Sequence, residues 1–197
     1  MEPQLGRELG PVLTALARTA VATSFEPRPP GAATLLADTP HELSRKTATF
    51  VTLERDGTLR GCVGTLAAVR PLGFDVIRNA RLAARDPRLP AVRRGELDDL
   101  KITVTVLSPS RPMAVGDFTT LLDRLRPGVD GLTLKDAGRR ATFLPSVWRG
   151  LPGPERFCAA LLRKGGWPES LWSGDLRSAA WPEGMAAEHY EAASFTD

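Results

Sequence analysis

The residues best suited to chemistry lie together in one short segment, Leu59-Arg60-Gly61-Cys62-Val63-Gly64. Side chains alternate along an extended strand, so Arg60 and Cys62 are expected on one face. A guanidinium beside a thiol stabilises the thiolate, which is the nucleophilic form of cysteine. Gly61 and Gly64 weaken a strand interior and allow a ligand or another backbone to approach closely. The segment is therefore a candidate site, with Cys62 as nucleophile, Arg60 as its support and the two glycines as binding positions.

The same segment has a purely structural interpretation. Alternation places Leu59 and Val63 on the face that packs against a core. Free cysteine is among the most buried residue types, so Cys62 also fits a small apolar position, and the glycines also fit a bulge. A nucleophile needs an oriented base, and nothing in the spacing of the two histidines, His41 and His189, places either beside Cys62.

Four polar residues elsewhere are candidate binding residues. Asp86 and Arg88 belong to an Asp-Pro-Arg loop, and polar loop residues often line a site, although Asp86 could simply pair with a neighbouring arginine. Asp130 precedes Gly131, a combination typical of a turn as well as of a ligand contact. Lys164 lies near the end of a predicted helix, where the helix dipole alone favours a cation.

The sequence argues against a bound metal. Its cysteines and histidines are far apart and show no paired spacing of the kind that zinc ligands have. Cys158 follows Phe157 on a predicted helix, where a core position is the simpler interpretation. We expect neither a metal nor a cofactor.

A β-hairpin positions the candidate segment. Residues 47–53 are rich in the β-branched and aromatic side chains that strands prefer. Arg55-Asp56-Gly57 supplies a turn, and residues 58–63 return as a second strand.

Three stretches have helical periodicity. Apolar residues recur at helical spacing from Leu5 to Ser24, and again after Pro71. The second helix must stop by Asp86, because the following proline disfavours helical geometry in the residue before it. A third helix is expected over residues 154–164, with Gly165 as its C-cap.

The remaining elements indicate the fold class. Residues 101–106 alternate polar and apolar, so Ile102, Val104 and Val106 should face a core. A short helix should follow Asp117, a good N-cap, and residues 132–144 should form a second hairpin. Strands and helices without strict alternation indicate an α+β protein, in which a mainly antiparallel sheet is flanked by helices.

The charge balance is modest. The 197 residues include 26 basic and 23 acidic side chains, and the net charge of +3 is too small to indicate nucleic acid by itself. A local cluster of arginines is compatible with a bound phosphate or with a solvated helix face followed by a charged loop. Its members are Arg78, Arg81, Arg85, Arg88, Arg93 and Arg94.

Cysteine usage and hydropathy indicate the compartment. Two cysteines are fewer than a secreted scaffold of this size would carry. Charged residues at Arg7, Glu8 and Arg18 interrupt the first apolar pattern, which argues against a signal peptide. No stretch reaches the length of a membrane span. We therefore expect a cytoplasmic protein that has no membrane partner.

Several ordered blocks resemble the AMMECR-one domain family, whose bacterial and archaeal members are called AmmeMemoRadiSam system protein A. The hairpin that contains Arg60 and Cys62 is similar to the family signature, with Val63 in place of the usual isoleucine. The resemblance runs from about residue 9 to residue 172. The further blocks are Asn79-Ala80, Ala83-Ala84, Asp86-Pro87-Arg88, Glu96-Leu97 and residues 104–108, 126–131 and 142–148.

The resemblance implies one AMMECR-one-like domain over residues 1–197, made of a larger and a smaller subdomain that share a cleft near the arginine–cysteine strand. It implies no established biochemical activity. The name of the system implies two partners, a Memo-like protein and a radical S-adenosylmethionine enzyme.

Three functions are compatible with these features. The one we favour is an accessory or binding subunit that acts with those two partners. The alternative is an enzyme with a catalytic cleft centred on Cys62, in which Arg60, Asp86, Arg88 or Lys164 assist. The third is nucleotide or nucleic-acid binding through the arginine-rich helix and loop. The sequence leaves open the reaction, if there is one, and the oligomeric state.

Overall fold

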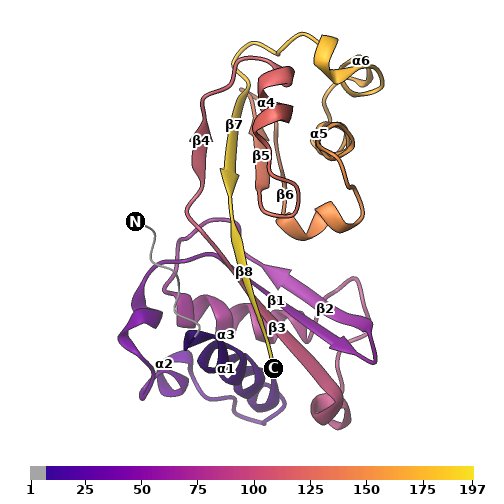
Figure 1. Ribbon diagram of the computed structural model, residues 1–197. Helices are drawn as coiled ribbons and strands as arrows, with labels where there is room; N and C mark the ends of the chain where they lie inside the picture. The colour runs from indigo at the N-terminus through magenta and orange to yellow at the C-terminus, as the bar shows by residue number, and fades with distance from the viewer. Residues whose placement is uncertain (1–7) are drawn as a thin grey trace. The chain divides into compact units, whose positions relative to one another are not determined.

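A computed structural model describes residues 8–197, which divide into two compact units (Figure 1). Unit 1 contains residues 8–107 and 193–197, and unit 2 contains residues 108–192. Each unit has a four-stranded antiparallel sheet and its own hydrophobic core. The predicted α+β class is therefore confirmed. No helix within residues 8–197 is long and apolar enough to cross a membrane.

Unit 1 is a sheet with helices packed on one face. The strand order is β2-β1-β3-β8. The elements in chain order are α1 (Leu9–Thr23), α2 (Ala32–Leu35), the 3-10 helix η1 (His41–Ser44), β1 (Thr49–Arg55), β2 (Thr58–Gly64), α3 (Leu72–Ala83), the 3-10 helix η2 (Arg94–Asp99), β3 (Leu100–Leu107) and β8 (Ala192–Thr196). The helix expected from Leu5 to Ser24 is α1, and Leu5 lies outside the described residues.

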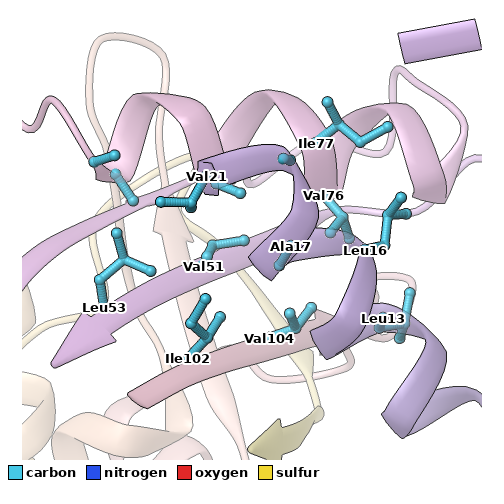
Figure 2. Close-up of a cluster of buried hydrophobic side chains, with 14 of the residues drawn as sticks. Leu13, Leu16, Ala17, Val21, Val51, Leu53, Val76, Ile77, Ile102 and Val104 are labelled. Atoms are coloured by element: carbon cyan, nitrogen blue, oxygen red, sulfur yellow. The ribbon is translucent and has the colours of Figure 1, made fainter. Parts of the chain in front are cut away.

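The core of unit 1 lies between the sheet and helices α1 and α3 (Figure 2). Leu13 from α1, Val76 from α3 and Val51 from β1 belong to this core, and all three are completely buried. Ile102 and Val104 of β3 complete this layer, as the alternating pattern predicted. Removal of this apolar surface from water is the main force that fixes the sheet against the helices.

The predicted hairpin is confirmed. β1 pairs with β2 in antiparallel register, and the turn between them holds Asp56 at φ 49° and Gly57 at φ 73°. Two consecutive positive φ angles are typical of the tight turn whose twist matches that of the flanking strands, and Asp-Gly adopts it readily. The hairpin therefore fixes the position of β2 along β1.

Unit 2 has the strand order β4-β7-β5-β6. Its elements are β4 (Arg111–Met113), α4 (Phe118–Arg124), β5 (Gly131–Lys135), β6 (Arg140–Phe143), the 3-10 helix η3 (Pro145–Arg149), α5 (Pro154–Lys164), α6 (Glu169–Trp172), the 3-10 helix η4 (Leu176–Ser178) and β7 (Ala186–Tyr190). Asp117 caps α4 through a hydrogen bond from Thr120 N–H, as predicted. The predicted bounds of α5 and its C-cap Gly165 are also confirmed.

Candidate functional site

A bulge interrupts β2 at Arg60. Leu53 pairs with Gly61 and Glu54 pairs with Leu59, so Arg60 is an extra residue without a partner on β1. Side-chain alternation does not continue across a bulge. One expectation is therefore wrong: Leu59 is 42% exposed rather than part of the core. The shared face of Arg60 and Cys62 stays a prediction, because strand alternation across the bulge no longer supports it.

The two glycines of β2 are packed closely by other parts of the protein. A Cβ atom at Gly61 would lie 1.9 Å from the carbonyl oxygen of Ala83, at the end of α3. A Cβ atom at Gly64 would lie 2.1 Å from Cγ of the Phe50 ring. Gly61 thus allows the close approach of a backbone, which is one of the uses expected for a strand glycine.

Asp86 and Arg88 hold the main chain of Cys62. The Cys62 N–H donates to Asp86 Oδ2 at 3.1 Å, and Arg88 Nη2 donates to the Cys62 carbonyl at 2.8 Å. Arg88 also donates to both carboxylate oxygens of Asp86, through Nε at 2.9 Å and Nη2 at 2.6 Å. We call Asp86 and Arg88, in these contacts, the Asp86–Arg88 clasp. Sequence reasoning grouped these residues with Cys62, but it did not anticipate that they bind its backbone.

The charges of the clasp stabilise each other. Asp86 is 2% exposed, and the hydrogen bonds from Arg88 and from the Cys62 N–H hold the pKa of its carboxyl well below the usual range. The pKa of Arg88 is raised, chiefly by Asp86, with a smaller contribution from the nearby Cys62 thiol. Asp86 is therefore ionised at neutral pH, and donors occupy both of its oxygens.

The thiol of Cys62 has a hydroxyl neighbour. Thr52 Oγ1 donates to Cys62 Sγ at 3.3 Å, and within residues 8–197 no imidazole or carboxylate hydrogen-bonds to this sulfur. Thr52 lies opposite Thr103 on β3, and Thr103 shares a 2.9 Å hydrogen bond with Thr196 on β8. Hydroxyl groups from β1, β3 and β8 thus continue across the sheet in line with Cys62.

Arg60 binds a different acidic residue. Its Nη2 donates to Glu96 Oε2 at 2.9 Å, and this oxygen also accepts from the Arg93 N–H at 2.7 Å. Arg55 Nη1 approaches the other oxygen of Glu96 at 3.4 Å. The hydrogen bond from Arg60, followed by that from Arg93, lowers the pKa of Glu96 from 4.5 to about 2.

Asp130 and Lys164 belong to unit 2 and are held by neighbours there. Asp130 accepts from Arg126 Nη2 at 2.6 Å and lies 3.3 Å from His189 Nδ1. Burial alone would raise the pKa of Asp130, but the hydrogen bonds from Arg126 outweigh burial and lower it. Lys164 Nζ donates to the Thr142 carbonyl at 2.8 Å. A binding role for either residue stays a prediction.

Neither histidine hydrogen-bonds to the Cys62 thiol. His189 is next to Asp130 in unit 2, and His41 is exposed at the start of η1. Cys158 is completely buried on α5, and burial raises the pKa of its thiol to about 12. Over residues 8–197, no group of three or more His, Cys, Asp or Glu side chains is arranged to hold a metal ion.

Comparison with known proteins assigns the chain to a family. The family model AMMECR1 matches residues 14–191. The chain belongs to the AMMECR1 family. The AMMECR-one resemblance is thereby confirmed. The chain is 34% identical over 173 residues to a protein of Methanothermobacter thermautotrophicus. This alignment covers 85% of the chain and 88% of that protein.

Other AMMECR1 relatives support the same assignment. A protein of Thermotoga maritima is 38% identical over 134 residues, covering 66% of this chain and 73% of its own length. The crystal structure of an uncharacterized protein from Pyrococcus horikoshii superposes with a TM-score of 0.80 at 29% identity, covering 96% of this chain and 92% of that one.

Sequence reasoning missed a buried polar network in this AMMECR1 protein. Asp75 Oδ2 accepts from the Thr49 hydroxyl at 2.8 Å and from Asn79 Nδ2 at 3.0 Å, and its Oδ1 accepts from Arg70 Nε at 3.2 Å. Asp75 is 1% exposed and Asn79 is completely buried. The available signal was two polar residues four positions apart on the apolar face of α3, beside Val76. The network links α3 to the start of β1.

Proposed function

We propose that this AMMECR1 protein is an accessory or binding subunit that acts with a Memo-like protein and a radical S-adenosylmethionine enzyme. The partners come from the family resemblance. Support for a binding role comes from the surroundings of Cys62. Cys62 and Cys158 are both free thiols, which supports a reducing, cytoplasmic setting for this role.

The observation that carries the proposal is that the Asp86–Arg88 clasp binds the backbone of Cys62 and not its thiol. Asp86 and Arg88 bind the N–H and C=O of Cys62 and bind each other, so their polar atoms are directed at backbone. A general base must be free to accept a proton, and its pKa should lie near the working pH. Asp86 has neither property, and Arg60 is engaged by Glu96. The charged groups around Cys62 therefore support a shaped surface better than an activated nucleophile.

Recovery of partners tests the proposal. The tagged full-length protein should recover at least one of the two proposed partners from a native lysate. Recovery of neither contradicts it.

The runner-up is an enzyme with Cys62 as nucleophile. The observation in its favour is that Arg88 Nη2 donates to the Cys62 carbonyl at 2.8 Å, which brings a guanidinium to the residue that carries the thiol. Alkylation by iodoacetamide separates the two functions. In the Cys158→Ala variant, which leaves one thiol, a binding subunit should react no faster at pH 7 than free cysteine. A rate more than about tenfold faster would favour the enzyme.

A further inference from the structure

An open groove of about 390 Å³ lies on the outer side of α3, beside the start of α2. Ala32, Phe74, Ile77 and Leu82 supply its apolar lining. Phe74 is 42% exposed and Leu82 is 40% exposed, although the opposite side of α3 is buried in the core of unit 1. The outer side of this helix thus exposes two large apolar side chains at positions where solvent-facing helices are usually polar.

Exposed apolar side chains gather in this part of the sequence. Of the six exposed large hydrophobic residues in the described chain, five lie between residues 59 and 82. They are Leu59, Leu66, Val69, Phe74 and Leu82. Single exposed apolar residues need no explanation. Phe74 and Leu82, however, line the same groove, as expected for a surface that binds another protein.

Three arginines line the groove, and two of them form no ion pair with an acidic side chain of residues 8–197. Arg78 and Arg81 line it, and neither forms an ion pair with any acidic side chain of residues 8–197. Arg81 Nη2 donates to the Pro30 carbonyl at 2.7 Å, which fixes the guanidinium in the wall, and Arg78 Nη1 donates to the neutral Asn79 side chain. Arg70 also lines the groove but is paired with Asp75. The groove therefore carries uncompensated positive charge.

The spacing of these residues fits a helical partner. Phe74, Arg78 and Leu82 recur every four positions along α3 and form one ridge. From Phe74 to Leu82 the helix rises about 12 Å, or slightly more than two turns. A ridge in which an arginine lies between two exposed apolar side chains complements a helix that has leucines on one side and carboxylates beside them.

We propose that this α3 groove docks an acidic amphipathic helix of a partner protein. Leucine-like side chains pack against Phe74 and Leu82, and carboxylates pair with Arg78 and Arg81. The proposal rests on the proposed function, since it assigns a docking surface to a binding subunit.

A designed peptide tests this surface on the full-length protein. The probe is a fluorescent helix of about 16 residues with leucines along one side and glutamates flanking them, and its binding is followed by anisotropy. Its matched control carries glutamine in place of each glutamate. The protein variants are Arg78→Glu and Phe74→Ala, and the charge-matched control is Arg149→Glu, an exposed arginine of η3 in unit 2. Thermal unfolding of each variant verifies that it is folded.

The acidic peptide should bind wild type, and the glutamine peptide at least about tenfold more weakly, because the carboxylates are lost. Arg78→Glu and Phe74→Ala should each raise Kd at least about fivefold, whereas Arg149→Glu should leave it unchanged. Equal binding of the two peptides, no binding at all, or equal effects of Arg78→Glu and Arg149→Glu would overturn the proposal. So would octyl phosphate or a short oligonucleotide that displaces the peptide at equal or lower concentration.

The two proposals fail in different ways. If the peptide does not bind, the groove is not a docking surface, and the accessory role is then judged from the recovery of the two partners alone. If neither partner is recovered from lysate but the acidic peptide binds wild type and Arg78→Glu weakens this binding, those two partners are rejected and the docking surface is retained.

Discussion

Asp86 and Arg88 take the place of a neighbouring strand beside Cys62. β2 is an edge strand, and the free N–H and C=O groups of an edge are available for pairing with another chain. At Cys62 a carboxylate accepts the N–H and a guanidinium donates to the C=O. Because these bonds involve ionised groups, they are stronger than ordinary backbone pairing. The clasp both closes the edge and fixes the position of the thiol.

Substitution of Asp86 should weaken unit 1. Asp86→Asn removes the charge that pairs with Arg88 and leaves an amide beside the Cys62 N–H. We expect the free energy of unfolding to fall by about 1–3 kcal/mol at neutral pH, measured by chemical denaturation. The control is Asp56→Asn in the hairpin turn. The Asp56 side chain is 88% exposed, and asparagine also tolerates the positive φ angle of this position. Equal stability of the two variants would show that the clasp is not stabilising.

Glu96 should contribute to the acid sensitivity of the fold. Its folded-state pKa of about 2 lies below the ordinary value of 4.5, so the folded protein binds this proton less readily than the unfolded chain. The resulting stability is present above about pH 4.5 and is lost as the pH falls toward about 2. Glu96→Gln should therefore flatten the decline in unfolding free energy over this window.

The matched control for this pH profile is Glu42→Gln. Glu42 is exposed on η1 and forms no ion pair with residues 8–197. A profile for Glu96→Gln that declines as steeply as that of Glu42→Gln would refute the role of Glu96.

At the scale of elements, the C-terminal end of α3 fixes the position of β2 at Gly61 and Cys62. α3 stops at Ala83, whose carbonyl approaches Gly61 more closely than any side chain permits. The chain then turns directly into Asp86 and Arg88, which reach back to Cys62. The helix end, the strand glycine and the clasp therefore form one packed arrangement.

Gly61→Ala tests this packing. The added Cβ would lie 1.9 Å from the Ala83 carbonyl oxygen, so the strand or the helix must shift. We expect a loss of about 1–3 kcal/mol in unfolding free energy, measured by thermal or chemical denaturation. Gly95→Ala is the control in the same unit, because no atom lies within 4 Å of its added Cβ. A Gly61→Ala protein as stable as Gly95→Ala would show that the contact is not tight.

Local patterns predicted much of the fold. The hairpin, α3, β3 and α5 depend on turn chemistry and on the period of their own apolar residues, so the sequence was sufficient. The bulge at Arg60 and the hydrogen bonds of Asp86 and Arg88 with the Cys62 backbone depend on where α3 ends in space. Strand alternation alone contains no information about that position, so Leu59 was placed in the core incorrectly.

Three strands, β4, β7 and β8, escaped prediction. For β7 and β8 the reason is that neighbouring strands stabilise them. β7 has the sequence Ala-Ala-Glu-His-Tyr and β8 has Ala-Ala-Ser-Phe-Thr, and neither run is rich in the residues that strands prefer. β7 lies between β4 and β5, and β8 pairs beside β3. Pairing with strands distant in the sequence is a tertiary effect that a pass along the chain does not detect.

At the scale of the whole molecule, the candidate features divide between the two units. Cys62, the clasp and the α3 groove belong to unit 1, whereas Asp130 and Lys164 belong to unit 2. Each unit has its own core. Substitutions on the surface of unit 1 should therefore change partner binding without unfolding unit 2.

Quantitative co-purification tests the binding role most directly. Tagged full-length wild type and Cys62→Ser are recovered from native lysate, with an untagged strain as background, and bound proteins are counted by mass spectrometry. Wild type should enrich the Memo-like protein, the radical S-adenosylmethionine enzyme or both. Cys62→Ser should enrich them equally, because serine keeps the backbone that the clasp binds. Recovery of neither partner by wild type would contradict the account.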